Sequence, residues 1–189
     1  MITTAEAFTG LYAAWRLFLR DARAVTLFDA SPRGAIKSFF CAVIVLPGYA
    51  LVVAYVHSVG LGETDWFRFF TVETIAYVAT WCAWPLLMYY VTQALDKSGG
   101  YLLYLTAFNW SAGPQMLVWL TVLFFAFTGI VSRDVVAILN IGALIIVLVY
   151  HLFIMRTTLK LTFFVALGLV IGEMMLSQFI NQARETMLR

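Results

Sequence analysis

Charged residues are scarce in this chain. Only 12% of its 189 residues are Asp, Glu, Lys or Arg, whereas about 25% is usual in soluble domains. Apolar residues make up 63%, and the mean hydropathy is +0.91. No polar segment is long enough to form a soluble domain with its own core. The composition therefore predicts one integral membrane domain.

Cysteine and histidine are also rare. Cys41 and Cys82 both lie in apolar runs, where cysteine usually acts as a small hydrophobic residue, and no CxxC or Cys/His cluster is present to bind a metal. The net charge is only +2, and there is no Lys/Arg tract, so nucleic acid is excluded as a partner. We expect neither a metal nor a cofactor.

Motifs of known enzymes are missing as well. The sequence contains no HExxH, no GxSxG, no Walker loop and no Gly-rich dinucleotide turn. Ser111 and His151 would supply a nucleophile and a base, but no motif supports this pair. His57 and His151 are expected at opposite faces of the membrane, which excludes a shared metal site. We predict that the protein is not an enzyme.

Long apolar runs, by contrast, dominate the chain. Five stretches are long enough to cross about 30 Å of hydrocarbon at about 1.5 Å per helical residue. They cover residues 36–57, 67–95, 101–128, 135–155 and 159–180. The predicted fold is an all-α, polytopic membrane bundle with a five-helix domain at 36–180. A short polar C-terminal tail is expected at 181–189.

The N-terminal segment at 1–35 is expected to hold a helix and a turn. Its residues 4–25 have helical periodicity but are not apolar enough to span a bilayer. Trp15 and Phe18 belong to an apolar face, and Arg16, Arg20 and Arg23 group along a neighbouring edge. This pattern is typical of an amphipathic helix on a membrane surface, with aromatic rings below the lipid headgroups and arginines at the phosphates. A partner-binding helix is the alternative. A turn is expected to end this N-terminal segment.

Lysine and arginine are distributed unevenly between the two predicted faces of the membrane. Eight of the twelve lie on the side that holds the N-terminus. The positive-inside rule therefore predicts a cytoplasmic N-terminus and an extracytoplasmic C-terminus. We expect the protein in a bacterial inner membrane.

Polar residues inside the predicted spans are the first candidate site. Glu73, Asn140 and Glu173 lie five to seven residues from the outer ends of three spans, about 7 to 11 Å deep. Ser177 continues the face of Glu173 one turn further along its helix. A carboxylate at membrane depth is costly unless it is paired, hydrated or functional. We favour an interhelical clamp formed by this polar layer, and a proton- or cation-sensitive site is the alternative.

A second candidate site surrounds a helix break in the third span. Pro114 lacks an N–H group, which leaves the carbonyl of Trp110 without its helical partner. Polar neighbours would satisfy that carbonyl or line a small cavity. The group comprises Asn109, Ser111, Gly113, Pro114 and Gln115. A structural kink is favoured over a ligand site.

Gly168 and Gly172 form a GxxxG spacing in the fifth span. This spacing allows close approach of another helix. Packing within the chain and dimerisation both remain open.

The layout of a cytosolic N-terminal segment followed by five closely spaced spans resembles the Yip family of five-span membrane proteins. The segments that carry the resemblance are LFDASPRGAIKSFF at 27–40 and FNWSAGPQ at 108–115, and it extends over residues 28–180. The chain lacks the longer acidic, aromatic-rich N-terminal region of the eukaryotic relatives, so binding to trafficking GTPases is not implied. The resemblance transfers no functional residue.

These observations favour a non-enzymatic membrane protein that acts by lateral association. It would serve as a scaffold or as an accessory subunit of a membrane assembly, with lipids and with other membrane proteins or itself as partners. The alternative is a small transporter or channel component that uses Glu73, Asn140 and Glu173. Lipid modification or lipid transfer is a third hypothesis.

Overall fold

The computed structural model describes residues 2–60 and 65–188, and all secondary structure within these ranges is helical. Five helices are long and apolar enough to cross a membrane, which confirms the predicted all-α, five-span organisation. The elements in order are α1 (Thr4–Phe18), the 3-10 helix η1 (Ala22–Leu27), α2 (Pro32–Ser38), α3 (Phe40–Gly60), α4 (Trp66–Ala94), the 3-10 helix η2 (Ser98–Gly100), α5 (Tyr101–Thr128), α6 (Arg133–Thr158) and α7 (Phe163–Leu188).

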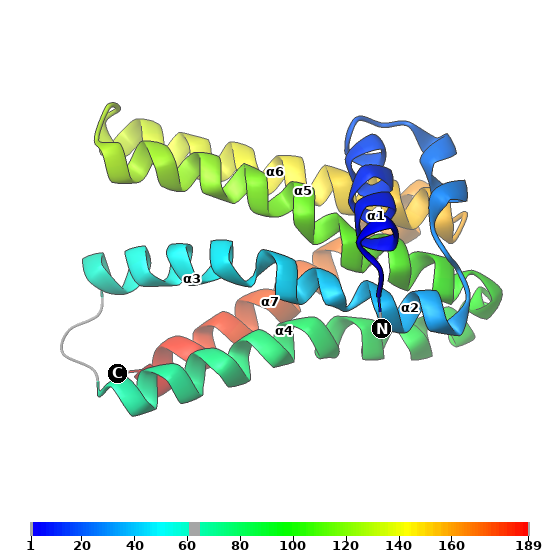
Figure 1. The fold of residues 1–189 in the computed structure, drawn as a ribbon, viewed down its shortest axis with the longest axis horizontal. Coiled ribbons are helices and arrows are strands. Elements are labelled where there is room, and N and C mark those ends of the chain that lie inside the picture. Colours follow the sequence, from blue (N-terminus) through cyan, green and yellow to red (C-terminus); the bar gives the residue numbers. More distant parts are fainter. Residues whose placement is uncertain (1, 61–64, 189) are drawn as a thin grey trace.

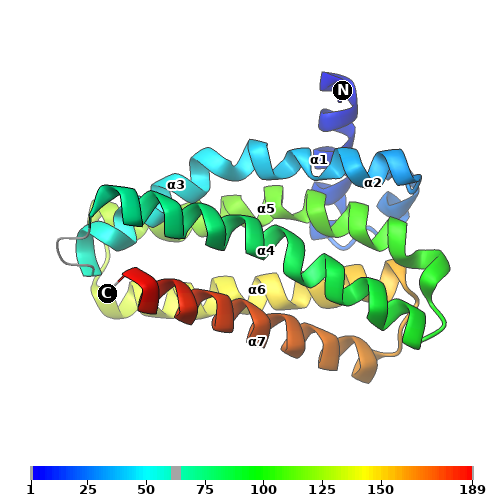
Figure 2. The ribbon, with the colours of Figure 1, turned by 90° about the horizontal axis from the view of Figure 1, so that it is seen from below.

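The long helices α3 to α7 run side by side along one axis (Figure 1 and Figure 2). Helix α5 packs against α3 and α6, while α7 packs against α4 and α6. The C-terminus lies at the same end of the bundle as the end of α3 and the start of α4 (Figure 1). The bundle therefore has an α3–α5–α6 side and an α4–α7 side, joined mainly through the α6–α7 contact.

Helix α7 continues to Leu188, eight residues past the predicted end of the last span at 180, so the polar residues 181–188 belong to the helix. Two residues beyond the predicted end have partners inside the bundle. Arg184 approaches Glu73 of α4, and Leu188 is buried beside Val53 and Phe69. These contacts stabilise the extra turns of helix that the apolar pattern alone did not indicate.

Helix α1 lies across the bundle (Figure 2) and packs on α5. Its buried face consists of the small residues Gly10, Ala13 and Ala14 together with Leu17. Gly10 contacts the Trp110 ring so closely that a methyl group there would overlap it. The helix thus docks on the protein through this face.

The predicted anchor residues of this segment divide between the protein and the surface. Arg16 pairs with Asp21, and Arg20 donates to the Val149 carbonyl at 2.9 Å. Phe18 packs edge-on against Tyr150, Trp15 is 43% exposed, and Arg23 is exposed. A role for the exposed residues in holding lipid stays a prediction.

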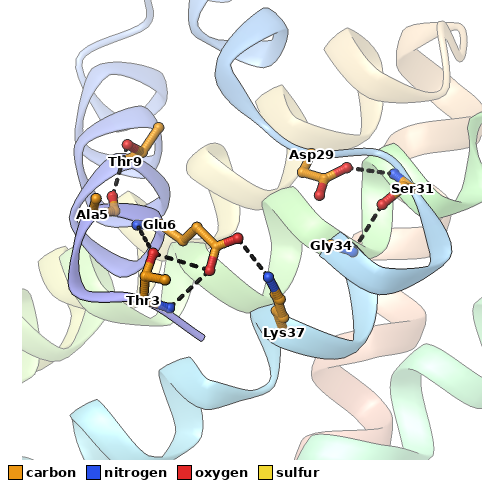
Figure 3. A network of polar contacts seen from close by, with 8 residues as sticks. All are labelled: Thr3, Ala5, Glu6, Thr9, Asp29, Ser31, Gly34 and Lys37. Carbon is orange, nitrogen blue, oxygen red and sulfur yellow. Dashed lines mark hydrogen bonds and ion pairs between the residues drawn. The ribbon is translucent and has the colours of Figure 1, made fainter. Parts of the chain in front are cut away.

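Polar contacts join the start of α1 to the last turn of α2 (Figure 3). Thr3 and Glu6 form a capping box at the beginning of α1. The Glu6 carboxylate also accepts a hydrogen bond from Lys37 Nζ at 2.5 Å. Ser31 caps α2 by accepting from the Gly34 N–H at 3.0 Å. The two caps therefore stabilise the helix starts, and the Glu6–Lys37 ion pair links α1 to α2.

Acid is expected to loosen this attachment. The hydrogen bonds from Lys37 and from the Thr3 backbone lower the pKa of Glu6 from 4.5 to about 2. Because the folded-state pKa lies below the ordinary value, the carboxylate stabilises the docked α1 above pH 4.5, and this contribution is lost as the pH falls toward about 2. Amide hydrogen exchange in α1, corrected for the intrinsic rate, should be faster near pH 2 than near pH 6. The variant Glu6→Gln should show a smaller difference, since Asp21, whose pKa is lowered by its hydrogen bond from Arg16, still responds to acid; an equal pH response in both proteins would contradict the expectation.

Candidate functional site

A cleft of about 430 Å³ lies between the long helices and takes lining residues from each of α3 to α7. Most of its wall is aromatic or aliphatic. The aromatic lining residues are Tyr49, Tyr77, Trp81, Trp84, Phe108 and Trp119. Polar side chains other than tyrosine come from α4 to α7, and they are Thr80, Gln115, His151, Glu173, Ser177, Gln178 and Asn181. The cleft thus combines an apolar wall with a few convergent polar groups, as ligand sites commonly do.

The polar centre of the cleft is a contact between His151 and Glu173. The imidazole Nδ1 lies 2.8 Å from the Glu173 Oε1, and the two side chains are only 7% and 10% exposed. His151 stands seven residues before the end of α6, and Glu173 stands ten residues after the start of α7. Because α6 and α7 are consecutive helices that pack together, this spacing brings the two side chains to similar depth.

The protonation pattern of this centre follows from a chain of hydrogen bonds. The Ser111 hydroxyl donates its single hydrogen to the Phe108 carbonyl at 2.6 Å. Its oxygen can therefore only accept from Gln115, whose Nε2 lies 2.7 Å away. The same amide nitrogen lies 2.6 Å from His151 Nε2. An amide nitrogen is a donor only, so with the Gln115 amide in this orientation His151 Nε2 accepts the hydrogen bond. The imidazole is then neutral, with its hydrogen on Nδ1, and it donates to Glu173.

A neutral imidazole leaves the charge of an ionised Glu173 uncompensated. Glu173 is buried, and its second oxygen, Oε2, has no hydrogen-bond partner among the described residues. A buried carboxylate with one free oxygen is costly in a medium of low dielectric constant. A proton or a bound cation at Oε2 would remove that cost. The centre can therefore hold a proton or a positively charged group.

Glu73 belongs to a different cluster, toward the C-terminal end of α7. Its carboxylate accepts a hydrogen bond from the Tyr49 hydroxyl at 2.9 Å and lies 3.4 Å from Arg184 Nη1. The three side chains join α3, α4 and α7. Glu73 thus acts as an interhelical clamp, and the sequence analysis missed both Tyr49 and Arg184. The signal for Arg184 was its place on the polar stripe of Glu173, Ser177 and Asn181, three residues beyond Asn181.

The prediction that Glu73, Asn140 and Glu173 form one polar layer is wrong. Asn140 is exposed, and its side-chain amide donates to the Val136 carbonyl of its own helix at 2.9 Å. Glu173 lies near the middle of α7, because the helix extends eight residues past the predicted end at 180. Ser177 lines the cleft with Glu173. The sequence analysis did not identify His151 as the partner of Glu173.

The residues around Pro114 serve two separate regions. Gln115 enters the cleft, and Ser111 positions it. Asn109 donates to the Ser38 hydroxyl at 2.8 Å, and Gly113 packs against Leu11 of α1. The carbonyl of Trp110, which Pro114 leaves free, receives a weak contact from the Cys41 thiol at 3.9 Å. Only part of this group therefore belongs to the cleft.

The two glycines of the GxxxG spacing have different surroundings. A methyl group added at Gly172 would lie 4.0 Å from the Trp84 ring, whereas one added at Gly168 would meet no described atom within 4 Å. The space beside Gly168 is therefore not filled by the described part of the chain.

Comparisons of this chain with protein-family models, with curated proteins and with solved structures found no match. Among the described residues, no group of three or more His, Cys, Asp or Glu side chains is placed to hold a metal ion. The cleft and its buried centre are the features from which a function can be inferred.

Proposed function

We propose that this protein is a small transporter or channel component that binds a solute in the cleft lined by all five long helices, α3 to α7. Glu173 is the group that holds the solute, and His151 and Gln115 position its carboxylate. The cleft volume of about 430 Å³ lies within the range of about 300 to 1,000 Å³ common for small-molecule sites. The observation that carries the proposal is the buried Glu173, which lines this cleft with one oxygen unpaired. Ionisable groups inside a membrane commonly mark substrate or ion pathways.

This proposal includes the orientation expected from the sequence. The N-terminus is cytoplasmic and the C-terminus extracytoplasmic, in a bacterial inner membrane, as the distribution of Lys and Arg supports. The protein binds and moves its solute without chemical change, so it is not an enzyme. The resemblance to the Yip family stays a prediction.

Uptake by proteoliposomes tests the function. The probes are a radiolabelled amine, an amino acid, a carboxylate and a sugar. At least one should enter faster than it enters protein-free liposomes. Replacement Glu173→Gln should slow that uptake at least about tenfold, because a hydrogen bond to a charged group contributes about 1.5 to 3 kcal/mol. The matched control is Glu185→Gln, which removes an exposed carboxylate from the same helix. Uptake of no probe, or equal uptake by both variants, would contradict the proposal.

Lateral association as a scaffold or accessory subunit is the second candidate function. It is favoured by the unfilled space beside Gly168, where another transmembrane helix could approach closely. Native mass spectrometry of gently extracted protein should then show a defined complex that Gly168→Ile disrupts. Gly142→Ile is the control, because Gly142 also has open space around it on α6. A lone monomer in the unaltered protein would exclude this function.

A further inference from the structure

The charge of the cleft restricts which solutes it can bind. Glu173 is the only carboxylate among the lining residues, and neither Lys nor Arg lines the cleft in the described part of the chain. Arg184, the nearest arginine along α7, is directed to Glu73 instead. His151 is neutral in the hydrogen-bond pattern given above. An anionic solute would find no opposite charge in the cleft, whereas a cation would find the Glu173 carboxylate.

The aromatic wall offers ring surfaces, and three of its five polar groups already have protein partners. The Tyr49 hydroxyl donates to Glu73, and the Tyr77 hydroxyl donates to the Ala42 carbonyl at 2.6 Å. The Trp84 indole N–H donates to the Tyr104 hydroxyl at 2.7 Å. These three polar groups are therefore occupied by protein partners. Aromatic faces attract cations through their quadrupoles and also contact apolar groups.

The free oxygen of Glu173 adds a requirement for a hydrogen-bond donor. Oε1 already accepts from His151, whereas Oε2 has no partner. A quaternary ammonium ion would supply charge but no N–H group. A protonated amine supplies both, and a charge-assisted hydrogen bond is about twice as strong as a neutral one.

We infer that the solute is an organic ammonium ion that carries at least one N–H group and an apolar body, an inference that rests on the proposed function. The N–H donates to Glu173 Oε2, and the apolar body lies against the aromatic wall. An ethanolamine lipid headgroup carries the same ammonium chemistry as a free amine. The chemistry of the site is common to both sources, and the test below separates them.

Three probes of related shape isolate charge and hydrogen bonding. Phenethylammonium has both, its N,N,N-trimethyl derivative has charge without an N–H donor, and propylbenzene has neither. Their affinities are measured by calorimetry on the full chain in phosphatidylcholine nanodiscs, with empty nanodiscs as the blank. Phenethylammonium should bind at least about tenfold more tightly than either of the other two probes. Glu173→Gln should remove this preference, and Glu185→Gln should preserve it.

The outcomes separate this inference from the function on which it rests. Equal affinities for the three probes in the unaltered protein would overturn the inference, and so would a preference that survives Glu173→Gln. If the carboxylate or sugar probe is nevertheless taken up by liposomes in a Glu173-dependent way, the proposed function stands without the ammonium assignment. The probe series in the unaltered protein gives a result even if Glu173→Gln fails to fold. Added phosphatidylethanolamine that weakens phenethylammonium binding would support the lipid headgroup as the source, and no effect would support a free amine.

Discussion

Replacement of Arg184 by glutamine is expected to lower the free energy of unfolding by about 3 kcal/mol. The substitution leaves the Glu73 carboxylate buried without its cationic partner, and breaking a buried ion pair from one side typically costs about 3 to 5 kcal/mol. The two side chains are 15% and 9% exposed, so water can compensate only in part. We place the effect at the lower end because the 3.4 Å contact is long and Tyr49 remains as a donor to Glu73.

A double replacement tests whether the loss of stability comes from the unpaired charge of Glu73 or from the loss of the Glu73–Arg184 contact itself. With Glu73→Gln and Arg184→Gln together, no buried charge is left unpaired, so most of the lost stability should return. Unfolding in mixed detergent micelles, followed by circular dichroism, gives the free energies. Arg68→Gln is the control, because Arg68 is exposed on α4. If the double variant is as unstable as Arg184→Gln alone, the pair does not act through charge compensation.

Replacement of His151 by phenylalanine should both destabilise the protein and abolish solute binding. Phenylalanine keeps most of the ring volume but cannot donate to Glu173 or accept from Gln115. Glu173 would then lose the partner at 2.8 Å, and the expected cost is about 3 kcal/mol.

The second substitution Glu173→Leu on this background should restore stability but not binding, because it removes the buried carboxylate together with the group that holds the solute. Stability is measured by the same unfolding method and binding by phenethylammonium calorimetry. His57→Phe is the matched control. His57 packs on the Phe69 ring with centroids 4.5 Å apart, and its Nδ1 has no hydrogen-bond partner among the described residues. Equal losses of stability in His151→Phe and His57→Phe would contradict the importance of the Glu173 contact.

The five spans could be predicted because hydrocarbon imposes a length and an apolar composition on each helix. Charged residues and glycines between the apolar runs indicated most of the helix ends to within a few residues. The prediction that the last span ends at residue 180 was wrong for a specific reason. Arg184 resembles a polar tail residue in the sequence, and only its contact with Glu73 of α4 shows that it belongs to the bundle. Such a partner, 111 residues away, is not visible in a local pattern.

The candidate site could be predicted only in part. Glu173, Ser177 and Gln115 stood out because polar residues are costly inside a membrane, and all three line the cleft. Their grouping was not predictable, since it depends on the rotation of each helix about its own axis. Asn140 is exposed and does not line the cleft, whereas His151 was assigned to the other side of the membrane and contacts Glu173.

The N-terminal helix illustrates the same limit. Its aromatic and arginine residues predicted contact with lipid, yet the face that docks on the bundle consists of three small residues and Leu17. The positions Gly10, Ala13, Ala14 and Leu17 have helical spacing, which was a visible signal. Which of the two faces would dock depended on the Trp110 ring of α5, and only the folded bundle brings that ring close to Gly10.

The most direct measurement is nitrogen-15 NMR of the His151 imidazole. His57→Phe in the labelled protein leaves His151 as the only histidine, so its two ring nitrogens can be assigned without ambiguity. The hydrogen-bond chain from Ser111 through Gln115 predicts a neutral ring, protonated on Nδ1 and unprotonated on Nε2, which leaves the charge of the Glu173 carboxylate uncompensated by His151. An imidazolium with hydrogen on both nitrogens would neutralise the carboxylate within the protein, and it would contradict the proposal that the cleft presents an uncompensated negative charge to its solute.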